Sequence, residues 1–375
     1  MKIWTQFAGF VLGTIMLGCS TSNEDASQAD IRTISPADYH VIMSGSSGLF
    51  TKTLSSNSEG LYFNGSTSLP LGANTPSLSF SKGTKVVMYQ DIGNCAGIIV
   101  SYDFNDTAEI SQEVFSDISS CDLTVTAIAG QADMVFLSYV LDTDPKEQSF
   151  YVRSINLTTG VYTDFILNEK PTDLVVSNAK LFVLTWDENR TDKNALTVLD
   201  YEENTKILEM DEGSNVGALF KKTNGDIVLS YPDSHTTLDS NSLSPTYTRY
   251  VSGTEPHFWD SENNTFDASG NMYYIRNDAL NLQTETIVAM YDFDKNGTLL
   301  YYFENFLNEA QLKVEFNIKS ATAVSFDNKN NLILIGYDKN TEAGGGIIRI
   351  TPAPDLTFVD NFDLDDIPFL ISPNE

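Results

Sequence analysis

Short apolar runs recur along the chain at nearly constant spacing. They occupy residues 39–43, 86–89, 134–139, 181–186, 227–231, 272–275 and 332–337. The turn or polar residues directly before them are Asp38, Lys85, Asp133, Lys180, Asp226, Asn271 and Asn331, so five intervals measure 45 to 48 residues and one measures 60. Each run is continuous rather than alternating and is too short for a helix. This pattern predicts strands that are buried on both faces.

Further short strands surround each run. A first, inner strand precedes it, as in residues 125–129, 174–177, 218–220 and 321–325, and a turn rich in Gly and Asn joins the two. Third strands are predicted at 97–102, 150–155, 195–199 and 287–291, and fourth strands at 161–167 and 299–303. Four antiparallel strands repeated every ~45 residues predict an all-β fold, a β-propeller of seven four-stranded blades. Six or eight blades stay open because the end units are the least regular. One short helix is predicted at 306–312, inside an insertion at 304–316.

Two hairpins carry a family resemblance. Residues 154–160 (SINLTTG) and 290–297 (MYDFDKNG) resemble the hairpins of bacterial YVTN-type and quinoprotein-like propellers. The resemblance covers about residues 35–365 as a pattern of strands and turns. Trp186-Asp187 and Trp259-Asp260 have no Gly-His partners in register, so the WD40 type is not predicted.

The N-terminal residues are typical of an export signal. Lys2 is followed by an apolar stretch at 7–17, which is too short to cross a bilayer as a helix, and then by Cys19. The segment resembles the lipobox of bacterial lipoproteins, in which the cysteine is acylated (palmitate) and becomes the new N-terminus. Met16 and Leu17 depart from that pattern, and a plain signal peptide with an incidental cysteine is the alternative. The resemblance implies a signal peptide at 1–18, a lipidated tether at 19–33 and one propeller domain at 34–375.

The residues after Cys19 suggest a location. Ser20 at the sorting position resembles an outer-membrane signal, and the acidic Asn-Glu-Asp at 23–25 resembles the surface-export signal of Bacteroidetes lipoproteins. These resemblances imply a lipid anchor in the outer membrane, with the protein on the periplasmic face or at the cell surface. The membrane is then a partner through the N-terminal lipid.

The other two cysteines predict a disulfide. Once Cys19 is set aside, Cys95 and Cys121 remain, an even number for an oxidising compartment. In a four-stranded blade the loop between strands two and three and the loop leaving strand four open on the same rim. Cys95 belongs to the first kind of loop and Cys121 to the second, so a bridge is geometrically reasonable. The alternative is two unpaired, buried cysteines.

The charge balance limits the possible partners. The 375 residues include 51 acidic and 22 basic ones, for a net charge of −29. Such a chain repels nucleic acid, and it argues against a basic pocket for an anionic quinone-type cofactor. The apolar fraction of 41% is sufficient for a folded core.

Aspartates recur where the second strands end. The six positions are Asp91, Asp142, Asp187, Asp233, Asp278 and Asp338. They are predicted to share one rim of the ring, where they could bind a cation, an amine or a basic partner surface. The alternative, which the sequence favours, is that each aspartate caps the end of its own strand in an Asx-turn.

A second acidic motif resembles half of a calcium loop. Asp292, Asp294 and Asn296 alternate ahead of Gly297, but Phe303 stands where the bidentate closing Glu would be needed. A plain hairpin turn is favoured over a calcium site, and no other cofactor is indicated.

Enzyme motifs are weak. His40, His235 and His257 lie in separate units, and the predicted inner strands carry none of the paired acids that a propeller glycosidase needs near its axis. The sequence therefore favours a non-enzymatic envelope lipoprotein that binds a ligand or acts as a scaffold. Its resemblance to envelope lipoproteins of this architecture implies a role accessory to an outer-membrane uptake or assembly system. Its partner would be an envelope protein or a glycan. The alternative is an extracellular carbohydrate-active enzyme with its site on the long-loop rim.

Overall fold

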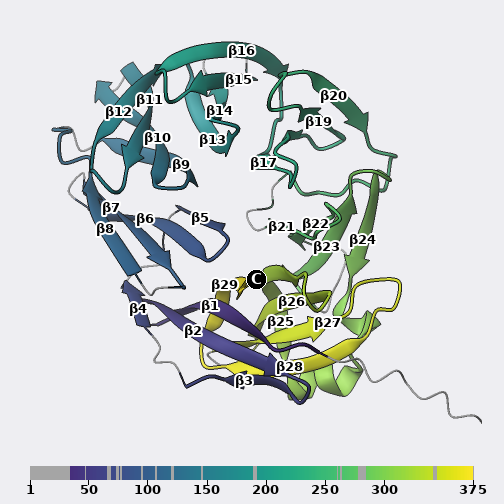
Figure 1. Cartoon of the computed structure of the whole chain (residues 1–375). Coiled ribbons are helices and arrows are strands. Elements are labelled where there is room, and N and C mark those ends of the chain that lie inside the picture. The colour runs from purple at the N-terminus through teal and green to yellow at the C-terminus, as the bar shows by residue number, and fades with distance from the viewer. Residues whose placement is uncertain are drawn as a thin grey trace, which may run out of the picture. The chain divides into compact units, whose positions relative to one another are not determined.

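The strands of the protein form seven antiparallel sheets arranged in a ring (Figure 1). The computed structural model describes residues 34–46, 48–65, 69–72, 76, 78–93, 96–105, 108–119, 122–144, 147–188, 192–259, 261, 264–277, 284–340 and 344–374. The ring belongs to the unit Ile34–Glu375. Each sheet is a blade, and in six of the seven blades the first strand along the chain lies nearest the ring axis and the last strand lies at the outside.

The first four blades follow the chain from its N-terminal side. Blade 1 contains β1 (Ala37–Gly45), β2 (Gly48–Asn57) and β3 (Gly60–Phe63), with β4 (Leu69–Gly72) also paired to β2. Blade 2 contains β5 (Leu78–Lys82), β6 (Lys85–Gly93), β7 (Ala96–Asp103) and β8 (Ala108–Val114). Blade 3 contains β9 (Leu123–Gln131), β10 (Met134–Asp144), β11 (Glu147–Asn156) and β12 (Tyr162–Leu167). Blade 4 contains β13 (Lys170–Ser177), β14 (Lys180–Asp187), β15 (Lys193–Asp200) and β16 (Thr205–Gly213).

The remaining strands complete the circle. Blade 5 contains β17 (Leu219–Lys221), β18 (Ile227–Ser230), β19 (Ser234–Leu238) and β20 (Pro245–Arg249). Blade 6 contains β21 (Asn264–Phe266), β22 (Met272–Asn277), β23 (Thr286–Asp292) and β24 (Gly297–Tyr301). Blade 7 contains β25 (Ile318–Asp327), β26 (Leu332–Lys339), β27 (Gly345–Ile350) and β28 (Phe358–Leu364). The last strand, β29 (Ile367–Asn374), is the innermost strand of blade 1.

The second strand of every blade is one of the seven apolar runs. Phe182 and Val183 of β14, for example, are completely buried, as are Ile333 to Ile335 of β26. Each of these strands lies inside its sheet, and side chains on both of its faces pack against a neighbouring blade. The predicted all-β propeller with seven four-stranded blades is confirmed.

The two ends of the described chain close the ring together. Strand β29 pairs antiparallel with β1, from Asp38 opposite Asn374 to Ser44 opposite Ile367. Figure 1 shows the yellow C-terminal strand beside the purple N-terminal one. The sequence did not predict this pairing. Blade 1 is thus built from both ends of the fold, and the ring is held shut by a sheet rather than by a loop contact.

Two buried arginines connect neighbouring blades at equivalent positions. Arg153 of β11 lies opposite Asp164 of β12, and Arg349 of β27 lies opposite Asp360 of β28. Arg153 binds both Asp164 and Asp117, the latter in the segment that leaves blade 2, at 2.7 and 2.6 Å. Arg349 is fully buried, and its guanidinium binds the Asp360 carboxylate through two nitrogens. Such paired, hydrogen-bonded charges are the form in which arginine is tolerated in a core.

The predicted helix is wrong in position. Residues 303–305 form one 3₁₀ turn, and the next helical turn begins only after Asn308 and continues through Gln311–Glu315. The reason is a reciprocal cap: the Gln311 N–H donates to the Asn308 side chain at 2.9 Å, and the Asn308 N–H donates to the Gln311 side chain at 3.1 Å. In the described residues no helix has the length and apolar character needed to cross a membrane.

Candidate functional site

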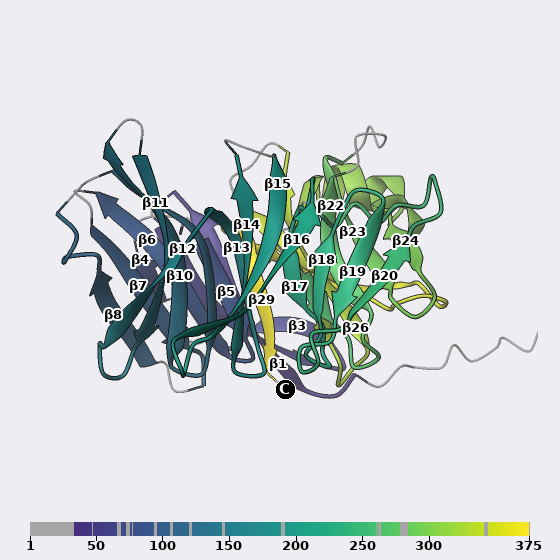
Figure 2. The ribbon, with the colours of Figure 1, turned by 90° about the horizontal axis from the view of Figure 1, so that it is seen from above.

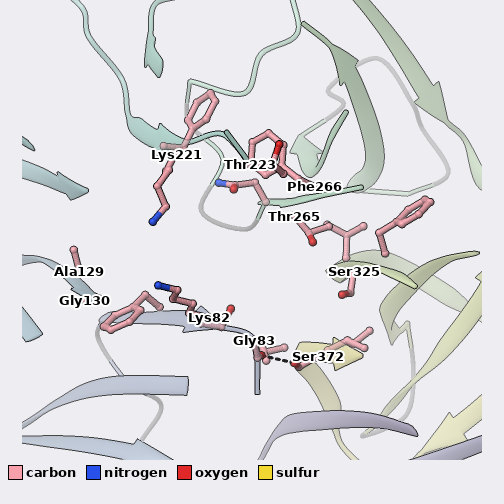
Figure 3. Close-up of a pocket in the computed structure, with 18 of the residues that line it drawn as sticks. Lys82, Gly83, Ala129, Gly130, Lys221, Thr223, Thr265, Phe266, Ser325 and Ser372 are labelled. Atoms are coloured by element: carbon pink, nitrogen blue, oxygen red, sulfur yellow. Dashed lines mark hydrogen bonds between the residues drawn. The ribbon is translucent and has the colours of Figure 1, made fainter. Parts of the chain in front are cut away.

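A cavity of about 800 Å³ lies on the ring axis. Residues of the innermost strand of every blade line it, namely β29, β5, β9, β13, β17, β21 and β25 and the turns that follow several of them. The seven inner strands surround this space in Figure 1, and Figure 3 labels lining residues from blades 2, 3, 5, 6 and 7 and from β29. The volume is in the range of cavities that hold small organic ligands.

Much of the cavity wall is aromatic. Five phenylalanines contribute to it, one from each of five inner strands: Phe80, Phe220, Phe266, Phe326 and Phe369. Phe220 and Phe326 are buried, whereas Phe80, Phe266 and Phe369 are half-buried and keep part of their rings free. These three rings offer apolar contact area to a bound molecule.

Hydroxyl groups are interspersed among the rings. Thr84, Thr223, Thr265, Ser325 and Ser372 all belong to the lining. Ser372 donates its hydroxyl to the Gly83 carbonyl at 2.8 Å, which connects β29 to the turn after β5 (Figure 3). The wall therefore combines apolar surface with groups that can donate and accept hydrogen bonds.

Two lysines place their ammonium groups in the cavity. Lys82 ends β5 and Lys221 ends β17, and Figure 3 shows both side chains directed into the open space. The Lys221 ammonium donates to the Val176 carbonyl at 2.9 Å. Burial, together with the charge of nearby Lys82, lowers the pKa of Lys221. None of the described residues that line the cavity is an acid.

A third lysine of the lining is engaged elsewhere. The Lys222 ammonium lies 4.8 Å from the centre of the Phe293 ring. Burial and the Lys222 charge lower the pKa of His235 to about 4. His235 is buried, bonded to the Tyr250 hydroxyl, and is neutral near pH 7. His40 stacks on Phe104, so these two histidines are packed into blades rather than into the cavity.

The predicted acidic rim lies at the other end of the blades. In blade 2, Lys82 pairs with Lys85 beside the first hairpin turn, whereas Asp91 lies at the far end of β6. The loops at the two ends of the strands are separated in Figure 2. Asp91 accepts the Gly93 N–H at 2.7 Å, as expected of an Asx-turn.

The other rim aspartates occupy the ends of their own strands. Asp233 accepts the Ser234 hydroxyl and lies 3.8 Å from Arg249, and Asp338 binds Ser320 and Lys319. Asp142 pairs with Gln148 and Asp187 with Lys193 across their hairpins, and Asp278 lies outside the described residues. Within the described ranges no three His, Cys, Asp or Glu side chains gather as a metal site would require. The rim as a ligand-binding face stays a prediction.

The calcium-like motif forms the turn between β23 and β24. Asp292 accepts the N–H groups of Asp294 and Lys295 at 3.0 Å, and its second oxygen binds the Lys295 ammonium at 2.7 Å. The side-chain amide oxygen of Asn296 accepts a hydrogen bond from the Tyr291 hydroxyl. These oxygens are thus used by the hairpin itself, and calcium binding by Asp292, Asp294 and Asn296 stays a prediction.

Two inner strands are longer than the ranges predicted for them, and each extension includes an aspartate. Strand β13 begins at Lys170 and includes Asp173, and β25 extends to Asp327. Burial raises the pKa of Asp173 to about 6, although its carboxylate accepts the N–H groups of Leu219 and Leu174 at 2.7 and 2.8 Å. Asp173 joins blade 4 to blade 5 and is not part of the cavity wall. Its role is to bond backbone that strand pairing leaves free.

Three other predicted residues cannot be placed. Cys19 lies outside the described residues, and so do Cys95, between β6 and β7, and Cys121, between β8 and β9. The lipidation and the disulfide therefore stay predictions. Lys82 and Lys221 were not predicted as site residues, although each lies within two residues of the first hairpin turn of its unit, where the repeat places residues near the axis.

A closed ring of seven four-stranded sheets around an axial cavity defines the protein as a seven-bladed β-propeller. Among solved structures it is similar to a candidate 6-phosphogluconolactonase from Bacteroides uniformis, with a TM-score of 0.54, 11% identity, and coverage of 91% of this chain and 100% of that one. It is also similar to the dihydro-heme d1 dehydrogenase NirN, with a TM-score of 0.53, 11% identity, and coverage of 92% and 76%.

A third similar structure is AztD from Citrobacter koseri, with a TM-score of 0.51, 10% identity, and coverage of 90% of this chain and 98% of that chain. At these identities the likeness concerns the fold alone. No protein-family model and no curated protein matches the sequence.

Proposed function

We propose that the protein is a lipid-anchored envelope propeller that holds a small ligand in its axial cavity without transforming it. The observation that carries this proposal is the cavity wall, where aromatic rings, hydroxyls and two ammonium groups converge from rigid inner strands. Binding groups on strands are positioned more accurately than groups on loops. The anchor, through Cys19, and the outer-membrane location are part of the proposal and rest on the resemblance of the N-terminal residues.

Incubation of the full chain with a panel of neutral glycans and small organic anions tests binding against catalysis. We expect at least one compound to be retained in equilibrium dialysis and to be recovered unchanged, as judged by its NMR spectrum after many hours. The physical reason is that the described residues of the wall offer contacts to the whole ligand but include no acid and base pair aimed at one bond. Formation of reducing ends or of any other product would contradict the proposal and favour the carbohydrate-active alternative.

Lipid anchoring has its own test. Replacing Cys19 by alanine removes the acylated thiol, and we expect the protein to move from the membrane fraction to the soluble fraction, since the acyl chains supply most of the membrane affinity. Ser20→Ala is the matched control and should remain with the membranes. A Cys19→Ala protein that still sediments with membranes would rule out the anchor but would leave ligand binding in the cavity unaffected.

A further inference from the structure

The lysine pair is unusual for this chain. The protein carries a net charge of −29, and most acids in the described residues lie on loops, strand ends and outer strands, while Asp173 of inner strand β13 bonds backbone N–H groups outside the cavity wall. The cavity wall has the opposite sign, because Lys82, Lys221 and Lys222 belong to it and none of its described residues is acidic. The local sign of charge is therefore reversed at the axis.

Neither cavity ammonium has a carboxylate partner among the described residues. Within the described ranges no ion pair joins Lys82 or Lys221 to an acid, and the Lys221 ammonium bonds the Val176 carbonyl. By contrast, Lys85, only three residues after Lys82, lies 3.5 Å from Asp133. Two like charges that share a cavity repel each other, and the Lys82 charge adds to burial in lowering the pKa of Lys221. An anion placed between them would remove that repulsion.

The net negative charge of the protein does not prevent an anion from binding in the cavity. At physiological ionic strength the field of exposed charges is screened over about 8 Å, whereas charges within a partly enclosed cavity interact with less screening. The sign of the charge that acts on a ligand inside the ring is thus set by the lining residues. Lysine is also a suitable residue for this task, since its ammonium binds carboxylates and phosphates as a point charge with three donors.

We infer that the axial cavity binds a small organic anion, a carboxylate or phosphate with an apolar body, through Lys82 and Lys221. The half-buried rings of Phe80, Phe266 and Phe369 would contact the apolar part, while the ammonium groups from blades 2 and 5 take the charged part. This inference rests on the proposed binding function and gives it a chemical class of ligand.

The test compares compounds that differ only in charge. The full chain is titrated calorimetrically with phenyl phosphate, benzoate, inorganic phosphate, benzyl alcohol and benzylamine. We expect phenyl phosphate or benzoate to bind, benzyl alcohol to bind at least tenfold more weakly, and benzylamine not to bind. Comparing the affinities for phenyl phosphate and benzoate distinguishes a phosphate ligand from a carboxylate ligand. Comparing the affinities for phenyl phosphate and inorganic phosphate shows how much the aromatic rings contribute to binding.

Substitutions of the two cavity lysines test whether Lys82 and Lys221 bind the anion. Lys82→Gln and Lys221→Gln should each weaken anion binding by roughly tenfold or more, the size expected for one hydrogen bond to a charged group. Lys82→Arg and Lys221→Arg keep the charge and should retain most of the affinity. Lys206→Gln is the matched control, because it removes the same charge from outer strand β16, where Lys206 binds Glu209. Circular dichroism and melting temperature confirm that each variant is folded.

The outcomes separate this inference from the proposed function. If the glutamine variants bind the anions as well as the native chain does, or if benzylamine binds best, the inference is wrong. If the native chain retains a neutral glycan but none of the anions, the inference is also wrong, whereas the binding function stands. Conversion of a retained compound into a product would instead overturn the proposed function.

Discussion

Replacing Arg349 by methionine is expected to lower the stability of the propeller by about 3–5 kcal/mol, the usual cost of removing one partner of a buried ion pair. Arg349 is fully buried and Asp360 keeps only 20% of its side chain exposed. The variant therefore leaves a largely buried carboxylate without its counter-ion. The melting temperature should fall by several degrees, measured by calorimetry on the full chain.

The position of Arg349 explains why the effect should be large. It lies at the junction of blade 7 and blade 1, where its guanidinium reaches the Tyr39 hydroxyl at 3.4 Å, and Tyr39 in turn donates to Asp327. The partner carboxylate, Asp360, also accepts the Leu61 N–H of β3 at 3.2 Å. The network of Arg349, Tyr39 and Asp360 therefore connects three strands of blade 7 to two strands of blade 1.

Two controls make the prediction specific. Lys206→Met removes a charge from a salt bridge whose side chains are 50% and 36% exposed, and it should change stability by less than ~1 kcal/mol. The double variant Arg349→Met, Asp360→Leu replaces both charges by apolar groups and should recover much of the loss, since the unpaired carboxylate is gone. If the Arg349→Met variant is as stable as the native chain, the Arg349–Asp360 pair does not hold the junction between blades 7 and 1.

The sequence predicted the repeat because the repeat has a local signal. Each second strand packs against a neighbouring blade on both faces, as Leu181 to Leu184 do, so most of its residues are apolar. Such runs stand out without any knowledge of what they contact. Turn residues with positive φ, such as Gly270 and Asn331, mark where the preceding hairpin ends.

Features that depend on distant residues could not be predicted in this way. The pairing of β29 with β1 joins segments more than 300 residues apart, and Pro368 interrupts the apolar pattern of the last strand. The helical turn after Asn308 was misplaced because Leu307 and Leu312 are both buried, and the apolar pattern alone does not say which residue is the cap.

The candidate site was missed for a different reason. Net charge is a sum over the whole chain, and the value of −29 led to the conclusion that an anion-binding pocket was unfavourable. What a ligand meets is the set of side chains on one surface. Lys82 and Lys221 are 139 positions apart in the sequence and come from blades 2 and 5, so only the closed ring brings their charges into one cavity.

Ending the chain after Asp366 is expected to lower the stability of the propeller more than any single substitution does, because it removes the whole of β29. The seven residue pairs that β29 makes with β1 are lost, and the inner edge of blade 1 is left open. Pro368 and Ile371 are buried, and Phe369 and Leu370 are half-buried. At about 1.5–3 kcal/mol for each fully buried large side chain, their loss is comparable to the whole stability of a typical domain, about 5–15 kcal/mol.

The truncated chain should therefore show no cooperative melting transition near that of the native protein and should be cut rapidly by proteases within blade 1. Because β29 also contributes Phe369 and Ser372 to the cavity, anion binding should be lost with it. A synthetic peptide of residues 367–375 added in trans should restore protection, since the open edge of β1 presents the backbone groups that β29 normally pairs with. A peptide of the same composition in scrambled order should not. If the truncated chain melts like the native one, the sheet formed by the two ends is not what keeps the ring closed, and the junction at Arg349 must carry that role instead.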